Sequence, residues 1–420
     1  MQILPSRSVM SFSRRCVILL CCMLFFLTSC ADTTGISSSS TSSGSTSTTA
    51  STSPAHPKSD INGIATEEML RARMTKVDHI IQGMSLDEKL GQLLMVEFFG
   101  SDYQSTELPY MIAQQHVGGF LYQPVNSNFH APNNTIDTAS QFPVKANADA
   151  KIPLLVAIDQ EGGLVSKLSD FYGDTPSASE MTATGDTNKV QQQGTQAAKW
   201  MQSLGINTDL APVVDVGPVS NLLQTRYFSD DPKIVATYAG AFLNGLQGSG
   251  TIGCLKHFPG LGSLTRAVDP HTGLPVVDES MAQLESTDFA PYKTLIQQNH
   301  PAMIMSTDVI TTAIDPIFPA ELSPKAINGV LRKELGYNGV VITDGLYMGG
   351  IQQKWNIAQA SVLAIIAGND MVEGPYTASQ VAGVIAALKA AMQQGQLSMD
   401  QVSQSVQRLL LMKMQYGIMK

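Results

Sequence analysis

Short apolar runs alternate with amphipathic stretches over most of the chain, from about residue 60 to residue 420. The apolar runs have the length of buried strands, and the stretches between them have helical spacing. The eight candidate strands are Leu94 to Phe98, Gly118 to Leu121, Leu154 to Ile158, Ile206 to Leu210, Ile252 to Lys256, Ala302 to Met305, Val340 to Thr343 and Ile366 to Val372. Strands that alternate with helices in this way predict a (β/α)8 TIM-type barrel forming a single catalytic domain. An open doubly wound sheet is the alternative, but no Gly-x-Gly-x-x-Gly motif opens a helix after the first strand.

The helical pattern is clearest at the two ends of this region. Apolar residues recur at helical spacing from about Ala65. Ser85 is followed three residues later by Glu88, which is typical of a capping box and indicates that a second helix begins there. At the other end, we expect covering helices from about Ala378 to Gln394 and from about Met399 to Tyr416.

The N-terminal segment has the pattern of an export signal. Arg7, Arg14 and Arg15 precede an apolar core, Val17 to Leu27, that is too short to span a bilayer as a stable helix. The core ends at Cys30, and the whole resembles a bacterial lipoprotein signal in which cleavage before Cys30 leaves this cysteine to be lipidated. The alternative is an ordinary signal peptide in which the cysteine has no role.

A stretch dominated by serine and threonine follows and cannot bury an apolar core, so we expect it to be disordered. We therefore predict a lipoprotein signal peptide over residues 1–29, a tether over residues 30–59 and the barrel over residues 60–420. The expected location is the cell envelope, outside the cytoplasm, with the membrane contacted through the lipid anchor only.

Charge and cysteine content narrow the function. The formal net charge of -9 argues against a nucleic-acid partner, which would require a basic surface. If Cys30 is acylated, Cys254 has no disulfide partner outside the leader, and its place in an apolar strand indicates a small buried hydrophobe. The seven histidines are scattered and no His-Glu-x-x-His motif is present, so we expect neither a metal nor a cofactor.

One run concentrates chemistry-bearing residues at the end of the fifth strand. Lys256 and His257 follow an apolar run, and the glycine- and proline-rich loop beyond them leads to Asp269-Pro270-His271. Residues two apart in an extended segment face the same side, and the proline favours that geometry for Asp269. Asp269 can then hold one ring nitrogen of His271 and leave the other free for proton transfer. A solvated loop histidine without function is the alternative.

A second run points to a carboxylate at a strand end. Val340 to Thr343 is apolar and stops at Asp344, which is typical of a buried parallel strand that delivers a side chain at its C-terminal end. The motifs Lys256-His257-Phe258-Pro259-Gly260-Leu261-Gly262, Asp269-Pro270-His271 and Gly339-Val340-Val341-Ile342-Thr343-Asp344-Gly345 resemble those of glycoside hydrolase family 3, in particular its single-domain β-N-acetylglucosaminidases of the NagZ type.

The resemblance implies a role for each of these residues. Asp344 corresponds to the nucleophile, and His271 oriented by Asp269 to the general acid/base of a retaining exo-β-N-acetylglucosaminidase. The implied sugar-binding residues are Asp159, Lys167, Arg226, Lys256 and His257, whereas Asp215 is expected to brace a loop. The implied partner is a carbohydrate, a β-linked N-acetylglucosaminide from peptidoglycan fragments or other amino-sugar oligosaccharides, and we expect a monomer.

The chain departs from the family pattern at several positions. Leu164 and Lys167 stand where the family usually has arginines, Leu261 where histidine is common, Pro270 where serine or threonine is usual, and Gly345 where a second aspartate often follows the nucleophile. Lysine offers a point charge in place of a forked donor. Two alternatives therefore stay open: a β-glucosidase or β-xylosidase on the same barrel, and a sugar-binding lipoprotein that has lost catalysis. Water and phosphate both stay open as the glycosyl acceptor.

Overall fold

The computed structural model describes residues 67–265 and 269–420, which belong to one compact unit. Its centre is a closed barrel of eight strands: β1 (Leu94–Val96), β2 (Gly119–Leu121), β3 (Leu155–Ile158), β6 (Thr208–Asp209), β7 (Ile252–Phe258), β9 (Met303–Ser306), β11 (Val340–Gly345) and β12 (Met371–Glu373). Every neighbouring pair is parallel. β1 closes the barrel because Leu94 pairs with Val372 of β12 and Met95 with Gly119 of β2. The predicted (β/α)8 fold is confirmed.

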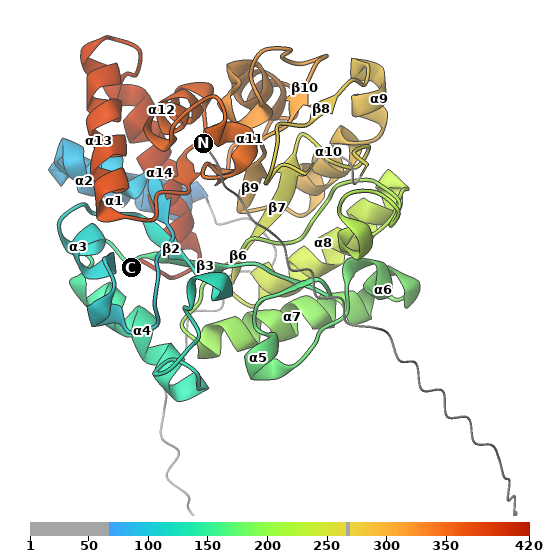
Figure 1. Cartoon of the computed structure of the whole chain (residues 1–420), viewed down its shortest axis with the longest axis horizontal. Helices are drawn as coiled ribbons and strands as arrows, with labels where there is room; N and C mark the ends of the chain where they lie inside the picture. The colour runs from blue at the N-terminus through green and yellow to red at the C-terminus, as the bar shows by residue number, and fades with distance from the viewer. Residues whose placement is uncertain (1–66, 266–268) are drawn as a thin grey trace, which may run out of the picture. The chain divides into compact units, whose positions relative to one another are not determined.

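Helices surround the barrel (Figure 1). They are α1 (Glu67–Gly83), α2 (Leu86–Gln92), α3 (Leu108–Ala113), α4 (Ile136–Asp149), α5 (Ser169–Tyr172), α6 (Ala178–Ala183), α7 (Thr187–Ser203), α8 (Pro232–Gly248), α9 (Met281–Ser286), α10 (Phe289–Gln298), α11 (Gly349–Gln352), α12 (Ile357–Ala367), α13 (Ala378–Gln393) and α14 (Met399–Gln415). A π-helix, η5 (Lys325–Glu334), follows β9. Short 3-10 helices are η1 (Tyr103–Ser105), η2 (Pro124–Asn126), η3 (Gln224–Arg226) and η4 (Ala320–Leu322). Two small sheets, β4 (Gln160–Gly162) with β5 (Val165–Ser166) and β8 (Val276–Val277) with β10 (Ile310–Thr311), lie outside the barrel.

Local sequence explains where these elements begin. Ser85 caps α2 as predicted, since its side chain accepts from the Glu88 amide and the Glu88 carboxylate accepts from the Ser85 amide. The prediction was wrong for the last strand, which begins at Met371 and not near Ile366. Ile366 lies in α12, which ends at a left-handed Gly368 with φ of 112°.

The predictions about the leader, the membrane and the cysteines have different outcomes. The signal peptide, the tether and Cys30 lie outside the described residues. Within the described residues, no helix is long and apolar enough to cross a membrane. Cys254 is a buried free thiol, and burial raises its pKa, which agrees with a packing role.

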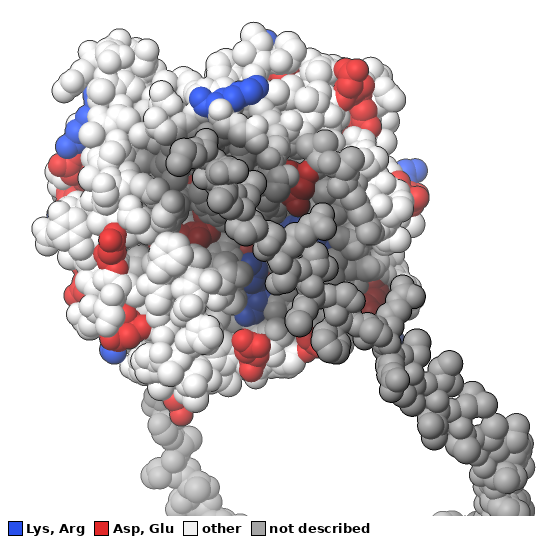
Figure 2. Space-filling model, viewed as in Figure 1, with Lys and Arg blue, Asp and Glu red and all other residues white. Residues whose placement is uncertain are grey.

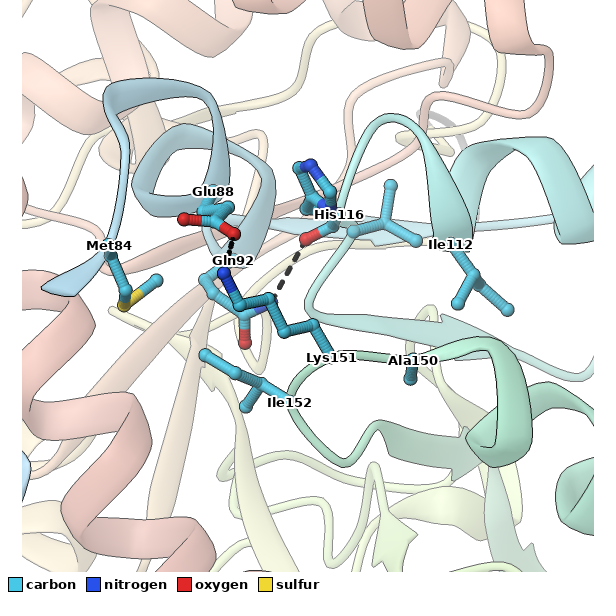
Figure 3. A pocket seen from close by; sticks show the side chains of 9 residues that line it. Met84, Glu88, Gln92, Ile112, His116, Ala150, Lys151 and Ile152 are labelled. Carbon is cyan, nitrogen blue, oxygen red and sulfur yellow. Dashed lines mark hydrogen bonds and ion pairs between the residues drawn. The ribbon is translucent and has the colours of Figure 1, made fainter. Parts of the chain in front are cut away.

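The two ends of the barrel differ in what they can bind. A small pocket lies near the N-terminal ends of β1, β2 and β3, where Lys151 pairs with Glu88 and Gln92 donates to the His116 carbonyl at 2.9 Å (Figure 3). Its volume of about 20 Å³ has room for a single water molecule. A cavity of about 660 Å³ opens where the strands end, and this is the end at which such barrels carry their active sites.

Candidate active site

The large cavity brings together all the candidate catalytic and sugar-binding residues. Its walls include Asp159, Lys167, Arg226, Lys256, His257, Asp269, His271 and Asp344. Because the strands are parallel, their C-terminal ends meet at one end of the barrel, and residues far apart in sequence converge there. Charged atoms of both signs are visible near the centre of the face in Figure 2, whereas much of the surface around them is uncharged.

One wall is a cluster of ion pairs around Glu161. Lys256 Nζ lies 2.6 Å from Asp159 Oδ1 and 2.7 Å from Glu161 Oε1. Arg226 binds the same glutamate through two bonds, Nε to Oε2 at 2.7 Å and an Nη to Oε1 at 2.8 Å. Burial alone would raise the pKa of Glu161, but the charges of Arg226 and Lys256 lower it to about 2. The cluster therefore fixes two cations and two carboxylates on one side of the cavity.

His257 is held by an aspartate that the sequence placed in a bracing role. Asp215 Oδ2 accepts from the His257 amide at 3.1 Å and lies 2.7 Å from its Nδ1, and Asp215 Oδ1 accepts from the Leu261 amide at 2.7 Å. The other ring nitrogen, Nε2, lies 3.4 Å from an Arg226 Nη atom. Since arginine only donates, Nε2 accepts and Nδ1 carries the proton. The expected bracing by Asp215 is confirmed.

Asp344 lies at the end of β11 with both carboxylate oxygens bound. Oδ1 accepts from the Gly345 amide at 2.9 Å, and Oδ2 accepts from the Thr307 hydroxyl at 2.9 Å. The side chain is half-buried and lines the cavity. A carboxylate held in one orientation at the edge of a cavity is suited to attack on an electrophilic carbon.

Asp269 and His271 form the predicted pair, but not in the predicted backbone geometry. His271 Nδ1 lies 2.7 Å from Asp269 Oδ1, and the same oxygen accepts from the His271 amide at 2.9 Å. The expectation of an extended segment was wrong: Pro270 to Thr272 form a turn, in which the Thr272 amide donates to the Asp269 carbonyl at 2.9 Å. Burial opposes ionisation of Asp269, but the hydrogen bonds from His271 lower its pKa overall. Nδ1 is thereby fixed as the donor, so Nε2 is the ring nitrogen that can exchange a proton.

The loop that carries this pair is docked onto the segment that follows the nucleophile candidate. The Gly349 amide donates to the His271 carbonyl and the Gly350 amide to the Pro270 carbonyl, both at 3.1 Å. Gln353 Nε2 donates to the Thr272 carbonyl at 2.9 Å. Asp344 and His271 are therefore connected through α11, although they follow different strands.

Lys167 differs from the other predicted sugar-binding residues. Its Nζ donates to Gln123 Oε1 at 2.7 Å, and among the residues of 67–265 and 269–420 it has no ion-pair partner. It lines the cavity, as does Leu164, which is 62% exposed. The charge of Lys167 is thus available to a ligand.

The structure also adds carboxyl groups that the sequence did not single out. Glu97, near the end of β1, and Glu373, in β12, both line the cavity, and each has one buried oxygen with no hydrogen-bond partner in the described part of the chain. Burial raises the pKa of Glu373, and Glu97 and Asp344 raise it further. A Cβ added to Gly345 would lie 2.9 Å from Glu373 Oε2. The space next to the nucleophile candidate, where the family often has an aspartate, is thus filled by the Tyr347 ring, whose nearest atoms lie 2.8 Å from that Cβ, and by the Glu373 carboxyl group of the neighbouring strand.

Among the described residues, no group of three or more His, Cys, Asp or Glu side chains is arranged to hold a metal ion. That the protein requires neither a metal nor a cofactor stays a prediction.

Comparisons with known proteins agree with this geometry. Residues 85–412 match the Glycosyl hydrolase family 3 N terminal domain. Beta-hexosaminidase LpqI of Mycobacterium tuberculosis is 33% identical over 339 residues, which are 79% of this chain and 83% of that protein. Beta-hexosaminidase A of Pseudoalteromonas piscicida is 30% identical over 331 residues, which are 73% of this chain and 55% of that protein, so the chain spans about half the length of this relative.

Solved structures give the same result. A glycoside hydrolase family 3 beta-N-acetylglucosaminidase from Paenibacillus sp. superimposes with a TM-score of 0.74 at 30% identity, covering 80% of this chain and 63% of that one. The structure of LpqI from M. tuberculosis superimposes with a TM-score of 0.71 at 32% identity, covering 80% and 96% respectively. The chain belongs to glycoside hydrolase family 3.

Proposed function

We propose that the protein is a retaining exo-β-N-acetylglucosaminidase that releases terminal N-acetylglucosamine from peptidoglycan fragments or other amino-sugar glycosides. The observation that carries the proposal is that Asp344 and the Asp269–His271 pair line one cavity. Retention needs a nucleophilic carboxylate and a separate acid/base, and these are the two groups present. The names of the relatives, beta-hexosaminidases and a beta-N-acetylglucosaminidase, support the same substrate class.

The reaction is a double displacement. Asp344 attacks the anomeric carbon while His271 Nε2 gives its proton to the glycosidic oxygen, which leaves with the aglycone. In the second step His271 takes a proton from water, the water oxygen attacks the anomeric carbon, and Asp344 departs as a carboxylate. Asp269 keeps the other ring nitrogen protonated throughout, so that the same atom of His271 serves in both steps.

The ion-pair cluster is suited to holding the sugar. Lys256 and Arg226 donate only, and Asp159 accepts only, so hydroxyl groups of a sugar can bond to both kinds of group. Glu161 fixes the two cations before a ligand arrives, which lowers the entropy lost on binding. Lys167, whose partner Gln123 is neutral, contributes a further donor.

The test compares nitrophenyl β-N-acetylglucosaminide with the matching β-glucoside, using the wild type and Asp344→Ala. Turnover of the N-acetylglucosaminide only, lost in Asp344→Ala, is the expected result. Preference for the glucoside would instead favour a β-glucosidase or β-xylosidase, and binding of both sugars without turnover would favour a sugar-binding lipoprotein.

We further propose that the protein is an exported lipoprotein, lipidated at Cys30, whose barrel acts as a monomer held at the membrane by the residue 30–59 tether. The order of basic residues, apolar core and cysteine in the leader supports this assignment. The expected result is incorporation of labelled fatty acid and recovery in the membrane fraction, both lost in Cys30→Ala. Labelling that persists in Cys30→Ala would contradict lipidation at Cys30. The expected monomer is tested separately, by measuring the molar mass of the tether-free barrel by light scattering.

A further inference from the structure

Two residues behind Asp344, Thr307 and Asp308, have no role in the mechanism described so far. They follow β9, the strand next to β11 in the barrel. Both side chains are fully buried. Thr307 Oγ1 lies 2.9 Å from Asp344 Oδ2 and 3.4 Å from Asp308 Oδ1. One hydroxyl group therefore stands between two carboxyl groups.

The direction of these hydrogen bonds follows from the charge of Asp344. An ionised carboxylate only accepts, so the single proton of Thr307 points to Asp344 Oδ2. The Thr307 oxygen can then accept a hydrogen bond, but its neighbour Asp308 can donate one only as a neutral carboxylic acid.

The surroundings of Asp308 favour the neutral acid. Its Oδ2 has no hydrogen-bond partner among residues 67–265 and 269–420, and a Cβ added to Gly350 would lie 2.6 Å from that oxygen. The ionisable groups that influence it are carboxyl groups, Asp344, Asp269 and Glu321, and no cation pairs with it among the residues described. Burial raises the pKa of Asp308 well above its ordinary value, and the charge of Asp344 raises it further. An unpaired buried anion next to another carboxylate would be strongly disfavoured.

We propose that Thr307 is a positioning residue for the nucleophile and that Asp308, as a neutral acid, donates to Thr307 and so orients its hydroxyl toward Asp344. The inference rests on the proposed function, because it takes Asp344 to be the nucleophile. The geometry fixes both oxygens of Asp344, one by the Gly345 amide and one by Thr307.

The hydrogen bond from Thr307 matters most in the second step. Asp344 is uncharged as a glycosyl ester and regains its negative charge as the sugar leaves. A hydrogen bond is stronger to a charged acceptor than to a neutral one, so Thr307 stabilises the transition state of ester hydrolysis more than the ester itself. No proton is transferred along the chain of Asp308, Thr307 and Asp344.

The experiment compares Thr307→Val, which removes the hydroxyl at nearly constant volume, with Thr307→Ser, which keeps it. On an activated aryl N-acetylglucosaminide, Thr307→Val is expected to lower kcat by roughly 10- to 100-fold. The glycosyl-enzyme then accumulates, so KM falls together with kcat and a burst of aryl alcohol appears. Thr307→Ser is expected to recover most of kcat. An unchanged kcat in Thr307→Val, or a kcat equally low in Thr307→Ser, would overturn the inference.

A matched control separates this role from a general effect of losing a threonine. Thr312 Oγ1 donates to Asp278 Oδ1 at 2.7 Å, and neither residue lines the cavity. Thr312→Val is expected to leave kcat and KM unchanged. If Thr312→Val lowered kcat as much as Thr307→Val, the assignment of Thr307 as a positioning residue would be overturned. Full activity of Asp344→Ala, assayed in parallel, would instead refute the proposed function.

The protonation state of Asp308 can be tested separately with two substitutions of this residue. Asp308→Asn keeps a donor toward Thr307, and Asp308→Leu removes it, so kcat is expected to fall further in Asp308→Leu. If Asp308 is neutral, Asp308→Asn removes no charge, and the acidic limb of kcat/KM against pH stays in place. A shift of that limb to lower pH would show that an anion had been removed and would overturn the neutral-acid assignment.

Discussion

His271 is the residue whose role can be separated most clearly from sugar binding. Its side chain is 70% exposed, so replacing it with alanine leaves little space to fill. Because a general acid matters most when the leaving oxygen is basic, we expect His271→Ala to lower kcat/KM for a methyl N-acetylglucosaminide by roughly 100- to 10,000-fold. The loss is expected to be much smaller for a dinitrophenyl glycoside, whose oxygen needs no proton to leave.

The exposed His79 on α1 provides a matched histidine control. His79→Ala is expected to leave both rates unchanged. An equal loss of kcat/KM on the methyl and dinitrophenyl substrates in His271→Ala would contradict the acid/base assignment.

At the scale of single residues, the sequence predicted pairs that are close along the chain better than pairs formed across the barrel. Asp269 and His271 could be paired from their spacing, although the turn that joins them was not foreseen. Glu161 was visible in the motif but its contacts were not, because Arg226 approaches it from η3 and Lys256 from β7. Thr307 bonds to Asp344 only because β9 and β11 are neighbours.

At the scale of elements, the docking of the His271 loop on α11 depends on a glycine. A Cβ added to Gly349 would lie 2.6 Å from the His271 carbonyl oxygen, a backbone atom that cannot rotate away. Gly349→Ala is therefore expected to displace the loop and to lower kcat/KM on a poor leaving group by roughly 10-fold or more, since small misplacements of a catalytic group are costly.

The control is Gly383 in the middle of α13, where an added Cβ meets nothing within 4 Å. Gly383→Ala is expected to leave activity unchanged and to stabilise the helix by about 0.5–1 kcal/mol. Thermal unfolding of both variants shows whether the fold is kept. Unchanged kcat/KM in a folded Gly349→Ala would mean that the contact does not position His271.

The predicted elements were most reliable where a strand is buried on both faces. Most of these strands have continuous apolar runs, and they could be located from that pattern, whereas β6 consists of Thr208 and Asp209 and is flanked by the apolar residues Ile206 and Leu210. The last was placed too early because Ile366 and Ala367 continue the apolar pattern of α12 up to Gly368. If the ends of β1, β9 and β12 had been read as closely as the others, Glu97 and Glu373 would have been added to the cavity lining and Thr307 as a contact of Asp344.

At the scale of the whole molecule, closure of the barrel buries a charge that no pattern in the sequence marks. Lys413 on α14 is fully buried near the N-terminal ends of the strands, where its Nζ donates to Gln92 Oε1 at 2.9 Å and to the Gly118 carbonyl at 3.0 Å. No carboxylate pairs with it within the part of the chain that the structure describes. Burial lowers the pKa of Lys413 to about 7. The aliphatic part of the Lys413 side chain fits the apolar face of the helix. The sequence pattern therefore predicted a helix that covers the barrel, but not a buried amine.

This burial has a consequence for stability against pH. In the unfolded chain the lysine stays protonated up to about pH 10.4, whereas in the folded protein it loses its proton near pH 7. The unfolded state therefore binds more protons between these values, and the free energy of unfolding rises with pH there by up to about 1.4 kcal/mol per unit. The protein is expected to gain roughly 2 kcal/mol between pH 7 and pH 9 from this group alone.

Urea unfolding of the wild type and Lys413→Met at pH 7 and pH 9 measures this contribution. Lys413→Met removes the titrating group, so the free energy of unfolding of this variant is expected to change less with pH than that of the wild type. The variant is expected to exceed the wild type in stability most at pH 7, where part of the buried amine is charged. Lys199→Met, at an exposed position of α7, controls for the loss of a lysine. If the free energy of unfolding changed by the same amount between pH 7 and pH 9 in the wild type and in Lys413→Met, Lys413 would keep its proton in the folded protein, held by the two carbonyl acceptors.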